Sequence, residues 1–371
     1  MNTIQRVVEE RLKNQFRKGK VHVVYGARRV GKTTMLTHFL SAVSSLKVYS
    51  GTGDDIQLRD ILSSENKTLI TSVFKGYDYI FIDEAQRIPN IGWGLKILVD
   101  ALPDVIILAT GSSAFDLSKK VGEPLTGRQM VYQMYPFSVA ELEAYSGRME
   151  VYENLKIYLV YGMYPEVVMA ENQQEKQDYL LQLRNSYLYK DILELENIKN
   201  SSKLNDLLKL IAYQIGHEVS LNELSNQLGI AKQTVERYLD LLEKSFIIFK
   251  VSGYSANLRK EITKSSRYYF WDNGVRNAII QNFNDLSARM DTGMMWENYC
   301  VSERMKKQRN HHVLFNNYFW RTYDQQEIDM IEEIGGELYA FEFKWNESKK
   351  VNVPAAFRKA YPNAVFETIT P

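Results

Sequence analysis

Three features of the sequence predict an α/β protein with several domains. A glycine-rich segment, GARRVGKT (26–33), lies between a β-rich run and a helical run. Two further apolar runs, YDYIFIDEAQ (77–86) and DVIILATGSS (104–113), are typical of buried strands. Strand, glycine loop and helix, followed by buried strands, predict a doubly wound parallel sheet. The chain of 371 residues is long enough for one or two further domains after this one.

Composition and charge exclude several classes of protein. The chain is 45% hydrophobic and 25% charged, which is ordinary for a globular protein. No stretch has the apolar length of a membrane span, and the charged amino terminus is not a signal peptide. Cys300 is the only cysteine, so we expect no internal disulfide and a cytoplasmic location. The net charge of +1 means that any nucleic-acid surface would have to be local.

The glycine loop is expected to bind the phosphates of a nucleotide. Its backbone N–H groups can close around phosphate at the start of a helix. Lys32 would reach the β- and γ-phosphates, and the Thr33 hydroxyl would help to hold Mg²⁺. Arg28 and Arg29 lie inside the loop and face either solvent or the base. The expected binding residues are Gly26, Arg29, Gly31, Lys32, Thr33 and Thr34, joined by Ser112 from a later strand end.

An acidic pair at the end of the next predicted strand supports this assignment. Asp83 would belong to the metal shell, and Glu84 would orient or activate the attacking water, as a nucleotide hydrolase requires. The alternative is an exposed acidic strand end. Thr110, Ser112 and Ser113 follow another strand, where they would either sense the γ-phosphate or cap the loop.

Arg128, in PLTGRQM, is a candidate arginine finger. It would act within its own chain or from a neighbouring subunit of a homo-oligomer, and the alternative is a solvated charge.

The middle of the chain is predicted to be helical and then a winged helix-turn-helix. YPFSVAELEAY (135–145) begins a helical stretch that runs to about residue 200. From 203 onwards an amphipathic helix, a capping box at Ser220 and Glu223, and a break at Gly229 precede AKQTVERYLDLLEKS (231–245). A hairpin candidate follows, which completes the pattern of a winged helix.

This module would place Lys232, Gln233, Thr234 and Arg237 against DNA. Between residues 244 and 276, seven basic residues against two acidic ones give a local charge of 7 − 2 = +5. Such a segment is a plausible phosphate-contact surface. The alternative is a module for protein docking. The seven are Lys244, Lys250, Arg259, Lys260, Lys264, Arg267 and Arg276.

The segment QEIDMIEEIGGELYAFEFKW (326–345) predicts a β-hairpin that turns at Gly335 and Gly336. Paired residues then have numbers that sum to 671, so Asp329 faces Glu342 and Glu327 faces Lys344. Directly opposed like charges cost stability. A divalent cation, Mg²⁺ or Mn²⁺, held by Asp329 and Glu342 would remove this repulsion.

Glu297, on a predicted helix at 293–307, extends this group to Glu297, Asp329, Glu342 and Lys344. Bound metal would polarise a phosphodiester, and Lys344 would stabilise the developing charge. The alternative is a hairpin with one charged, solvent-facing side and an ordinary Glu327–Lys344 ion pair.

The order of these motifs resembles a known family. GARRVGKTT, IFIDEAQRIPN, LATGSSAF and LTGRQ followed by YPFSVAEL are similar to prokaryotic AAA-type P-loop ATPases. Members of that family carry a winged helix joined to a PD-(D/E)xK-like domain with a restriction-endonuclease fold. The resemblance implies ATP binding at Gly31, Lys32 and Thr33, with Asp83 and Glu84 as the metal and hydrolysis pair. It also implies that Glu297, Asp329, Glu342 and Lys344 match the nuclease motif.

The sequence therefore predicts an ATPase that acts on DNA and has a metal-dependent nuclease candidate governed by nucleotide state. The alternative is an ATP-dependent switch or scaffold whose last domain binds a partner without cutting. The substrate is open between DNA and RNA. The expected domains are a P-loop core (1–136), a helical lid (137–200), a winged helix-turn-helix (201–285) and a nuclease-like domain (286–371).

Overall fold

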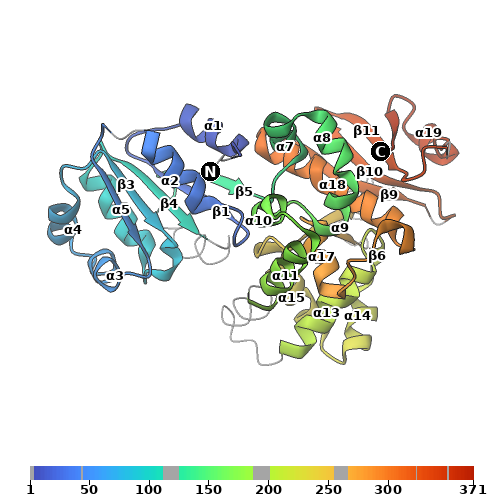
Figure 1. Ribbon diagram of the computed structural model, residues 1–371, viewed down its shortest axis with the longest axis horizontal. Helices are drawn as coiled ribbons and strands as arrows, with labels where there is room; N and C mark the ends of the chain where they lie inside the picture. The colour runs from blue at the N-terminus through green and yellow to red at the C-terminus, as the bar shows by residue number, and fades with distance from the viewer. Residues whose placement is uncertain are drawn as a thin grey trace. The chain divides into compact units, whose positions relative to one another are not determined.

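The computed structural model describes residues 4–42, 45–111, 125–186, 201–254, 266–322, 324–348 and 351–371. The chain forms two compact units. The first contains residues up to Phe137 together with 141–145 and 244–246, and the second contains the rest. In Figure 1 the first unit runs from blue to cyan and most of the second from green to red.

The first unit is built on a parallel sheet in the order β2-β3-β4-β1-β5. Its strands are β1 (Val21–Gly26), β2 (Val48–Thr52), β3 (Tyr79–Asp83), β4 (Ile106–Gly111) and β5 (Gln129–Met134). Its helices include α1 (Val7–Asn14), α2 (Lys32–Ala42), α3 (Ile56–Ser63), α4 (Lys67–Phe74), η1 (Ala85–Arg87) and α5 (Ile91–Ala101). The predicted parallel α/β architecture of the front of the chain is confirmed.

The central strand shows why this sheet forms. Every residue of β1 is buried, because β1 lies between β4 and β5. Continuous burial is typical of parallel strands that are covered on both faces. Helix α1 at the amino terminus is amphipathic: its Val8 and Leu12 are buried, as is Ile4 just before it.

The second unit combines helices with a mixed sheet in the order β12-β11-β10-β9-β7-β8-β6. Its helices include α8 (Arg148–Glu153), α9 (Leu155–Tyr161), α10 (Pro165–Met169), α11 (Gln173–Leu183), α13 (Ser201–Tyr213), α14 (Leu221–Leu228), α15 (Lys232–Lys244), α17 (Asn273–Ile280), η3 (Leu286–Ala288), α18 (Thr292–Asn310) and α19 (Ala355–Ala360). Its strands are β6 (Glu218–Val219), β7 (Ile248–Gly253), β8 (Ser266–Phe270), β9 (Asn316–Arg321), β10 (Glu327–Ile334), β11 (Glu337–Phe343) and β12 (Val365–Ile369). Helix α7 (Val139–Ser146) has residues in both units. None of the described helices is both long enough and apolar enough to cross a membrane.

The hairpin register was predicted correctly. Strands β10 and β11 pair from Met330–Phe341 to Ile334–Glu337, and each pair sums to 671. Gly335 and Gly336 have φ angles of 58° and 89°, the positive values that a tight two-residue turn requires. The regular pairing ends at Met330, where β10 also has an irregularity against β9 between Ile328 and Ile331.

The predicted boundary at 285/286 does not separate two independent sheets. Strand β7 pairs in parallel with β9 through Ser252–Tyr318 and Gly253–Phe319. This pairing joins β6, β7 and β8 to β9–β12 in a single seven-stranded sheet. Hydrogen bonds therefore cross the expected division at 285/286.

The predicted helical lid also differs from expectation, since its described helices after residue 146 belong to the second unit. Helix α9 packs on α17, where Asn277 Nδ2 donates to the carbonyls of Leu159 and Val160. The buried Asp272 carboxylate accepts from the backbone N–H groups of Met163 and Val275. These bonds fix α9 to α17 and explain why α9 belongs to the second unit.

Gly162, at the end of α9, offers a test of this packing. Its φ is 74°, and a Cβ there would lie 2.0 Å from Asp272 Oδ1. Gly147 has a φ of 90° with nothing within 4 Å of a Cβ. We expect Gly162→Ala to lower the free energy of unfolding by at least ~2 kcal/mol more than Gly147→Ala, because both strain the backbone but only Gly162→Ala adds a clash. Urea unfolding measures this, and equal losses would contradict the packing role.

Candidate functional site

The glycine loop holds Lys32 at the carboxyl edge of the first sheet. Lys32 begins α2, directly after a loop in which Gly31 has a φ of 91°. Its Nζ donates to the carbonyls of Gly26 at 3.0 Å and Ala27 at 2.8 Å. Burial lowers the pKa of Lys32 to about 8, although Glu84 and Asp83 oppose this shift. The ammonium is therefore held inside the loop, beside two carboxylates.

Gly26 has a packing role that the sequence did not reveal. A Cβ at Gly26 would lie 2.1 Å from the Met134 carbonyl oxygen of β5. Only glycine allows the two strands to approach this closely. The other predicted loop residues, Arg29, Thr33 and Thr34, are exposed and so accessible to a ligand.

Asp83 is placed by two hydroxyl groups. Thr33 Oγ1 donates to it, with distances of 2.8 and 3.0 Å to the two carboxylate oxygens. Thr110 Oγ1, from β4, donates to Oδ1 at 2.5 Å. A threonine hydroxyl and a carboxylate in contact are oxygen ligands of the kind that Mg²⁺ prefers, so Thr33 and Asp83 fit the predicted metal shell.

Glu84 follows in a left-handed conformation with φ 48°. Its N–H donates to Thr110 Oγ1 at 2.9 Å, and its carboxylate accepts from Gln86 Nε2 at 2.5 Å. Thr110 is fully buried and bound to both acidic residues. It is therefore better placed to position Asp83 and Glu84 than to contact a γ-phosphate. Ser112 and Ser113 lie outside the described residues.

Arg128 lies at the opposite edge of the sheet. Its carbonyl accepts from the N–H of Val21, the first residue of β1, whereas the glycine loop follows the last residue, Gly26. Its guanidinium pairs with Asp100 at 2.8 Å. This placement contradicts a finger that acts within its own chain, because the length of β1 separates Arg128 from Lys32. A role in a neighbouring subunit stays a prediction.

The hairpin carboxylates do converge, together with Glu297. Their side chains are 16% exposed for Glu297 and 6% for Asp329 and Glu342. This burial contradicts a solvent-facing charged side. Asp329 Oδ2 accepts from the N–H of Phe343 at 2.9 Å, so the carboxylate occupies the point where the regular pairing ends.

Cations of the chain itself neutralise these carboxylates. Lys344 Nζ lies 2.5 Å from Glu342 and 3.4 Å from Asp329. The buried Arg267 lies 3.8 Å from Glu297 and 3.9 Å from Asp329. Arg267 also pairs with Glu327 at 2.9 Å, so the alternative Glu327–Lys344 ion pair is absent as well.

The metal predicted at Asp329 and Glu342 does not fit this arrangement. Among the described residues no group of three or more His, Cys, Asp or Glu side chains is placed to hold a metal ion. Lys344 occupies the space between the two carboxylates, and its positive charge offsets their mutual repulsion without a metal. The prediction overlooked that the lysine itself can bridge them.

Arg267 and Tyr269 were missed as members of this group. Both project from β8, and Tyr269 donates to Glu297 Oε1 at 2.8 Å. Burial raises the pKa of Glu297 to about 8, reinforced by Asp329 and opposed by Arg267. Burial and Asp329 raise the pKa of Glu342 to about 7. The sequence could have indicated this, because alternate residues of a strand lie on the same face. In RYYF this rule places Arg267 and Tyr269 on one side of an apolar strand.

The basic segment 244–276 is less available to DNA than its charge suggested. Arg267 is 3% exposed and Arg276 is 1% exposed, and Arg276 binds Asp291 and the Ala212 carbonyl. Two of the seven cations are therefore internal. Lys250 is exposed, and Arg259, Lys260 and Lys264 lie outside the described residues.

Helix α15 presents a mixed surface. Its Val235, Leu239 and Leu242 are buried. Lys232, Gln233 and Arg237 are exposed, but so are Glu236 and Asp240. The basic Lys232 and Arg237 are thus interspersed with the acidic Glu236 and Asp240 along the helix.

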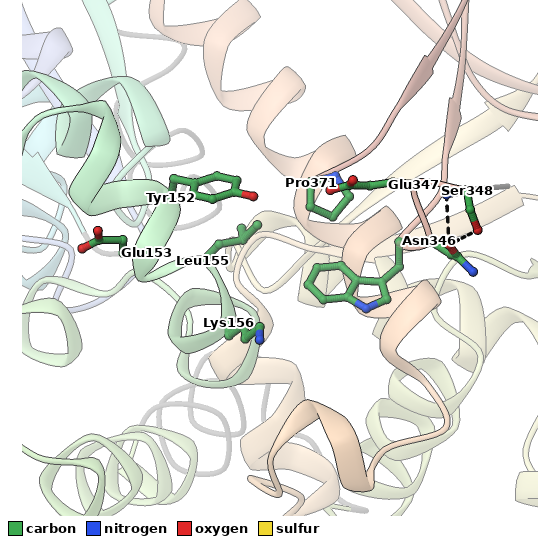
Figure 2. A pocket seen from close by; sticks show the side chains of 9 residues that line it. Tyr152, Glu153, Leu155, Lys156, Asn346, Glu347, Ser348 and Pro371 are labelled. Carbon is green, nitrogen blue, oxygen red and sulfur yellow. Dashed lines mark hydrogen bonds between the residues drawn. The ribbon is translucent and has the colours of Figure 1, made fainter. Parts of the chain in front are cut away.

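A cleft of about 1070 Å³ has Trp345, the residue after Lys344, in its lining. Figure 2 shows Tyr152, Leu155 and Lys156 on one side of this cleft and Asn346 and Glu347 on the other. Glu153 is also part of the lining, so the described rim carries both signs of charge. The cleft offers aromatic surface close to the carboxylate group without a clear preference for a charged ligand.

Residues 18–143 match the family model of an AAA domain. This match covers most of the first unit and supports the predicted resemblance to AAA-type ATPases. Residues 152–286 and 292–368 match two further models, both described as domains of unknown function. These two matches meet near the expected boundary at 285/286, although the sheet is continuous there.

The chain is similar to several other proteins. It is 25% identical over 350 residues to an uncharacterized protein of Mycobacterium tuberculosis, covering 92% of this chain and 74% of the relative. A match of 75 residues, 37% identical, covers 20% of this chain and 27% of the HTH-type transcriptional activator ArnR of Sulfolobus acidocaldarius. AMPPCP-bound DnaA from Aquifex aeolicus superposes with a TM-score of 0.28 at 14% identity, covering 65% of this chain and 86% of DnaA. That superposition is too loose to support an inference.

The raised pKa of Glu297 predicts a pH dependence of stability. A carboxyl with a folded pKa of about 8 and an ordinary unfolded pKa of 4.5 binds more protons in the folded state between these values. Its stabilising contribution is complete below pH 4.5 and is lost as the pH rises through 8. We expect the free energy of unfolding to fall by a few kcal/mol from pH 5 to pH 8, and Glu297→Gln to flatten this slope.

Urea unfolding of both proteins in EDTA, at several pH values, measures the difference. Glu347→Gln, which removes an exposed carboxylate after the hairpin, is the control for the general effect of losing a carboxylate. Parallel slopes for the wild type and Glu297→Gln would show that Glu297 is ionised in the folded protein.

Proposed function

We propose that this protein binds and hydrolyses ATP in its first unit and binds DNA through its second. The contact of Thr33 with Asp83, beside the buried Lys32, carries the first part of this proposal. An AAA domain match over residues 18–143 supports it, because this class of domain uses nucleotide and usually Mg²⁺.

The described residues supply the parts of a hydrolase. Lys32 would exchange its bonds to the Gly26 and Ala27 carbonyls for phosphate oxygens, whose charge favours its protonated form. Thr33 and Asp83 would hold Mg²⁺, which neutralises phosphate charge when bound. Glu84 would accept a proton from, or orient, the attacking water, and Gln86 holds its carboxylate in place.

Two substitutions separate binding from hydrolysis. We expect Lys32→Ala to lose both, because the phosphates lose their cation. Glu84→Gln should retain ATP binding and lower turnover by roughly 10²- to 10⁴-fold, because the amide cannot take a proton. Phosphate release and equilibrium binding of labelled ATP measure the two effects. Lys96→Ala, on α5, should resemble wild type, and undiminished turnover in Glu84→Gln would remove Glu84 from the site.

The proposed DNA surface is the first part of α15. The elements α13, β6, α14, α15, β7 and β8 follow one another in the order expected of a winged helix-turn-helix. Ser220 caps α14, and Gly229 ends it in a left-handed conformation, so a tight turn precedes α15. The exposed Lys232, Gln233 and Arg237 then provide donors for phosphate and base edges. The match of 75 residues to an HTH-type transcriptional activator favours DNA binding by the chain.

Removing the two exposed cations of α15, Lys232 and Arg237, tests the surface. We expect Lys232→Ala combined with Arg237→Ala to weaken duplex DNA binding and to reduce the slope of log affinity against log salt by about 2, one for each lost phosphate contact. Fluorescence anisotropy at several salt concentrations gives the slope. Lys359→Ala, an exposed lysine on α19, is the control. An unchanged slope would move DNA binding away from α15.

A second candidate function is cleavage of DNA at the cluster of carboxylates formed by Glu297, Asp329 and Glu342. The convergence of Glu297, Asp329, Glu342 and Lys344 in one buried cluster favours it. The position of Lys344 between Asp329 and Glu342 opposes it, because no metal ion fits there in this arrangement. We therefore derive no catalytic step through a metal at this site.

A cleavage assay decides between this candidate and a nucleotide-operated switch. Wild type, Asp329→Asn and Lys32→Ala would be incubated with supercoiled, linear and branched DNA in Mg²⁺ or Mn²⁺, with and without ATP. Cutting that Asp329→Asn abolishes is the result expected of a nuclease, and loss in Lys32→Ala would show control by nucleotide. No cutting on any substrate, with ATP turnover intact, would support a switch that binds a partner.

A further inference from the structure

A second cavity in the second unit, of about 320 Å³, lies between α18 and the hairpin. None of its lining residues belongs to the cluster of Glu297, Asp329, Glu342 and Lys344. None belongs to the lining of the cleft that contains Trp345. One wall is the helix face formed by Arg304, Lys307 and His311, which follow one another at helical spacing. This volume is at the lower end of the range of small-ligand sites.

The opposite wall is apolar. Phe315, Ile334, Tyr339 and Phe341 contribute its surface, from the loop before β9 and from β10 and β11. The Arg304 guanidinium carbon lies 3.5 Å from the centre of the Phe341 ring, so the two planar groups are in close contact. A flat ligand could extend this stack, because aromatic and guanidinium faces both favour planar partners.

The charge of the cavity is positive. Glu332, the acidic residue of the lining, is 4% exposed. Its carboxylate accepts hydrogen bonds from Arg304 Nε at 2.7 Å and Arg304 Nη2 at 2.9 Å. It also accepts one from Gln308 Nε2 at 2.7 Å. Its charge is therefore matched by Arg304, while Lys307 is exposed and forms no ion pair with the described residues. Arg304 Nη1 likewise makes no hydrogen bond within the described part of the chain.

We propose that this cavity binds a small organic anion with a planar apolar body. The apolar wall would cover the body, and Lys307 with Arg304 Nη1 would bind the anionic group by charge-assisted hydrogen bonds. His311 would add a ring nitrogen at the same wall. An aromatic carboxylate and a mononucleotide share this chemistry. The site is separate from the nucleotide loop, so the proposal stands whether or not the protein hydrolyses ATP.

Isothermal titration of the full chain with 1-naphthoate tests the site directly. We expect one bound anion per chain and a loss of affinity of about tenfold in Lys307→Gln. The neutral analogue 1-naphthamide should bind wild type about tenfold more weakly than the acid. Leu314→Ser is the matched control, because Leu314 is 92% exposed, adjoins the cavity in sequence and is not part of its lining. Glu337→Gln, which removes the carboxylate that accepts from the Tyr339 hydroxyl, should not weaken binding.

Thymidine 5′-monophosphate, titrated into Lys32→Ala, distinguishes the two sources of anion while the glycine loop is disabled. Lys307-dependent binding of the nucleotide would assign the cavity to nucleotides, and binding of naphthoate alone would assign it to aromatic carboxylates. Equal affinity of wild type and Lys307→Gln for naphthoate would overturn the proposal. So would equal affinity for naphthoate and naphthamide, or no binding of either anion at about 1 mM.

Discussion

Arg267 extends from β8 into a group of carboxylates that would otherwise repel one another inside the second unit. Its guanidinium lies within 4 Å of Glu297, Glu327 and Asp329, which belong to α18 and β10. Buried carboxylates at such distances are stable only if they are protonated or paired. The protein uses both solutions, because burial raises the pKa of Glu297 and Glu342 while Arg267 and Lys344 supply positive charge. Strand β8 is thereby fixed to the hairpin and to α18.

The first unit arranges its charges in a different way. Lys32, Asp83 and Glu84 lie near one another at a sheet edge, but hydroxyl groups and backbone carbonyls hold them apart from direct ion pairs. Such bonds are readily exchanged for those of a phosphate or a metal shell. In the second unit, by contrast, the clustered carboxylates of Asp329 and Glu342 already form ion pairs with Lys344. The two sites therefore differ in how readily they accept a charged ligand.

The sequence predicts most reliably the features that depend on neighbouring residues. GARRVGKT contains its strand end, loop and helix start, and the hairpin register follows from the two glycines at its turn. Arg267 could not be assigned in this way, because its partners lie 30 to 62 residues further along the chain. A count of basic residues placed it on the surface, whereas only the fold shows that it is buried. Arg128 was misplaced for a similar reason, since it directly precedes β5, and the parallel direction of β5 places it at the amino end of the sheet.

The parallel pairing of β7 with β9 has a consequence for how this chain can be divided. The two strands are separated by more than 60 residues, yet they share one sheet. A fragment that ends before α18 would leave an edge of β7 without its neighbour, and a fragment that begins there would leave β9 in the same state. Unpaired edges attract foreign strands and promote aggregation. Recombination or shuffling of gene segments near residue 290 would therefore yield pieces prone to self-association, so the two segments of unknown function are expected to be inherited together.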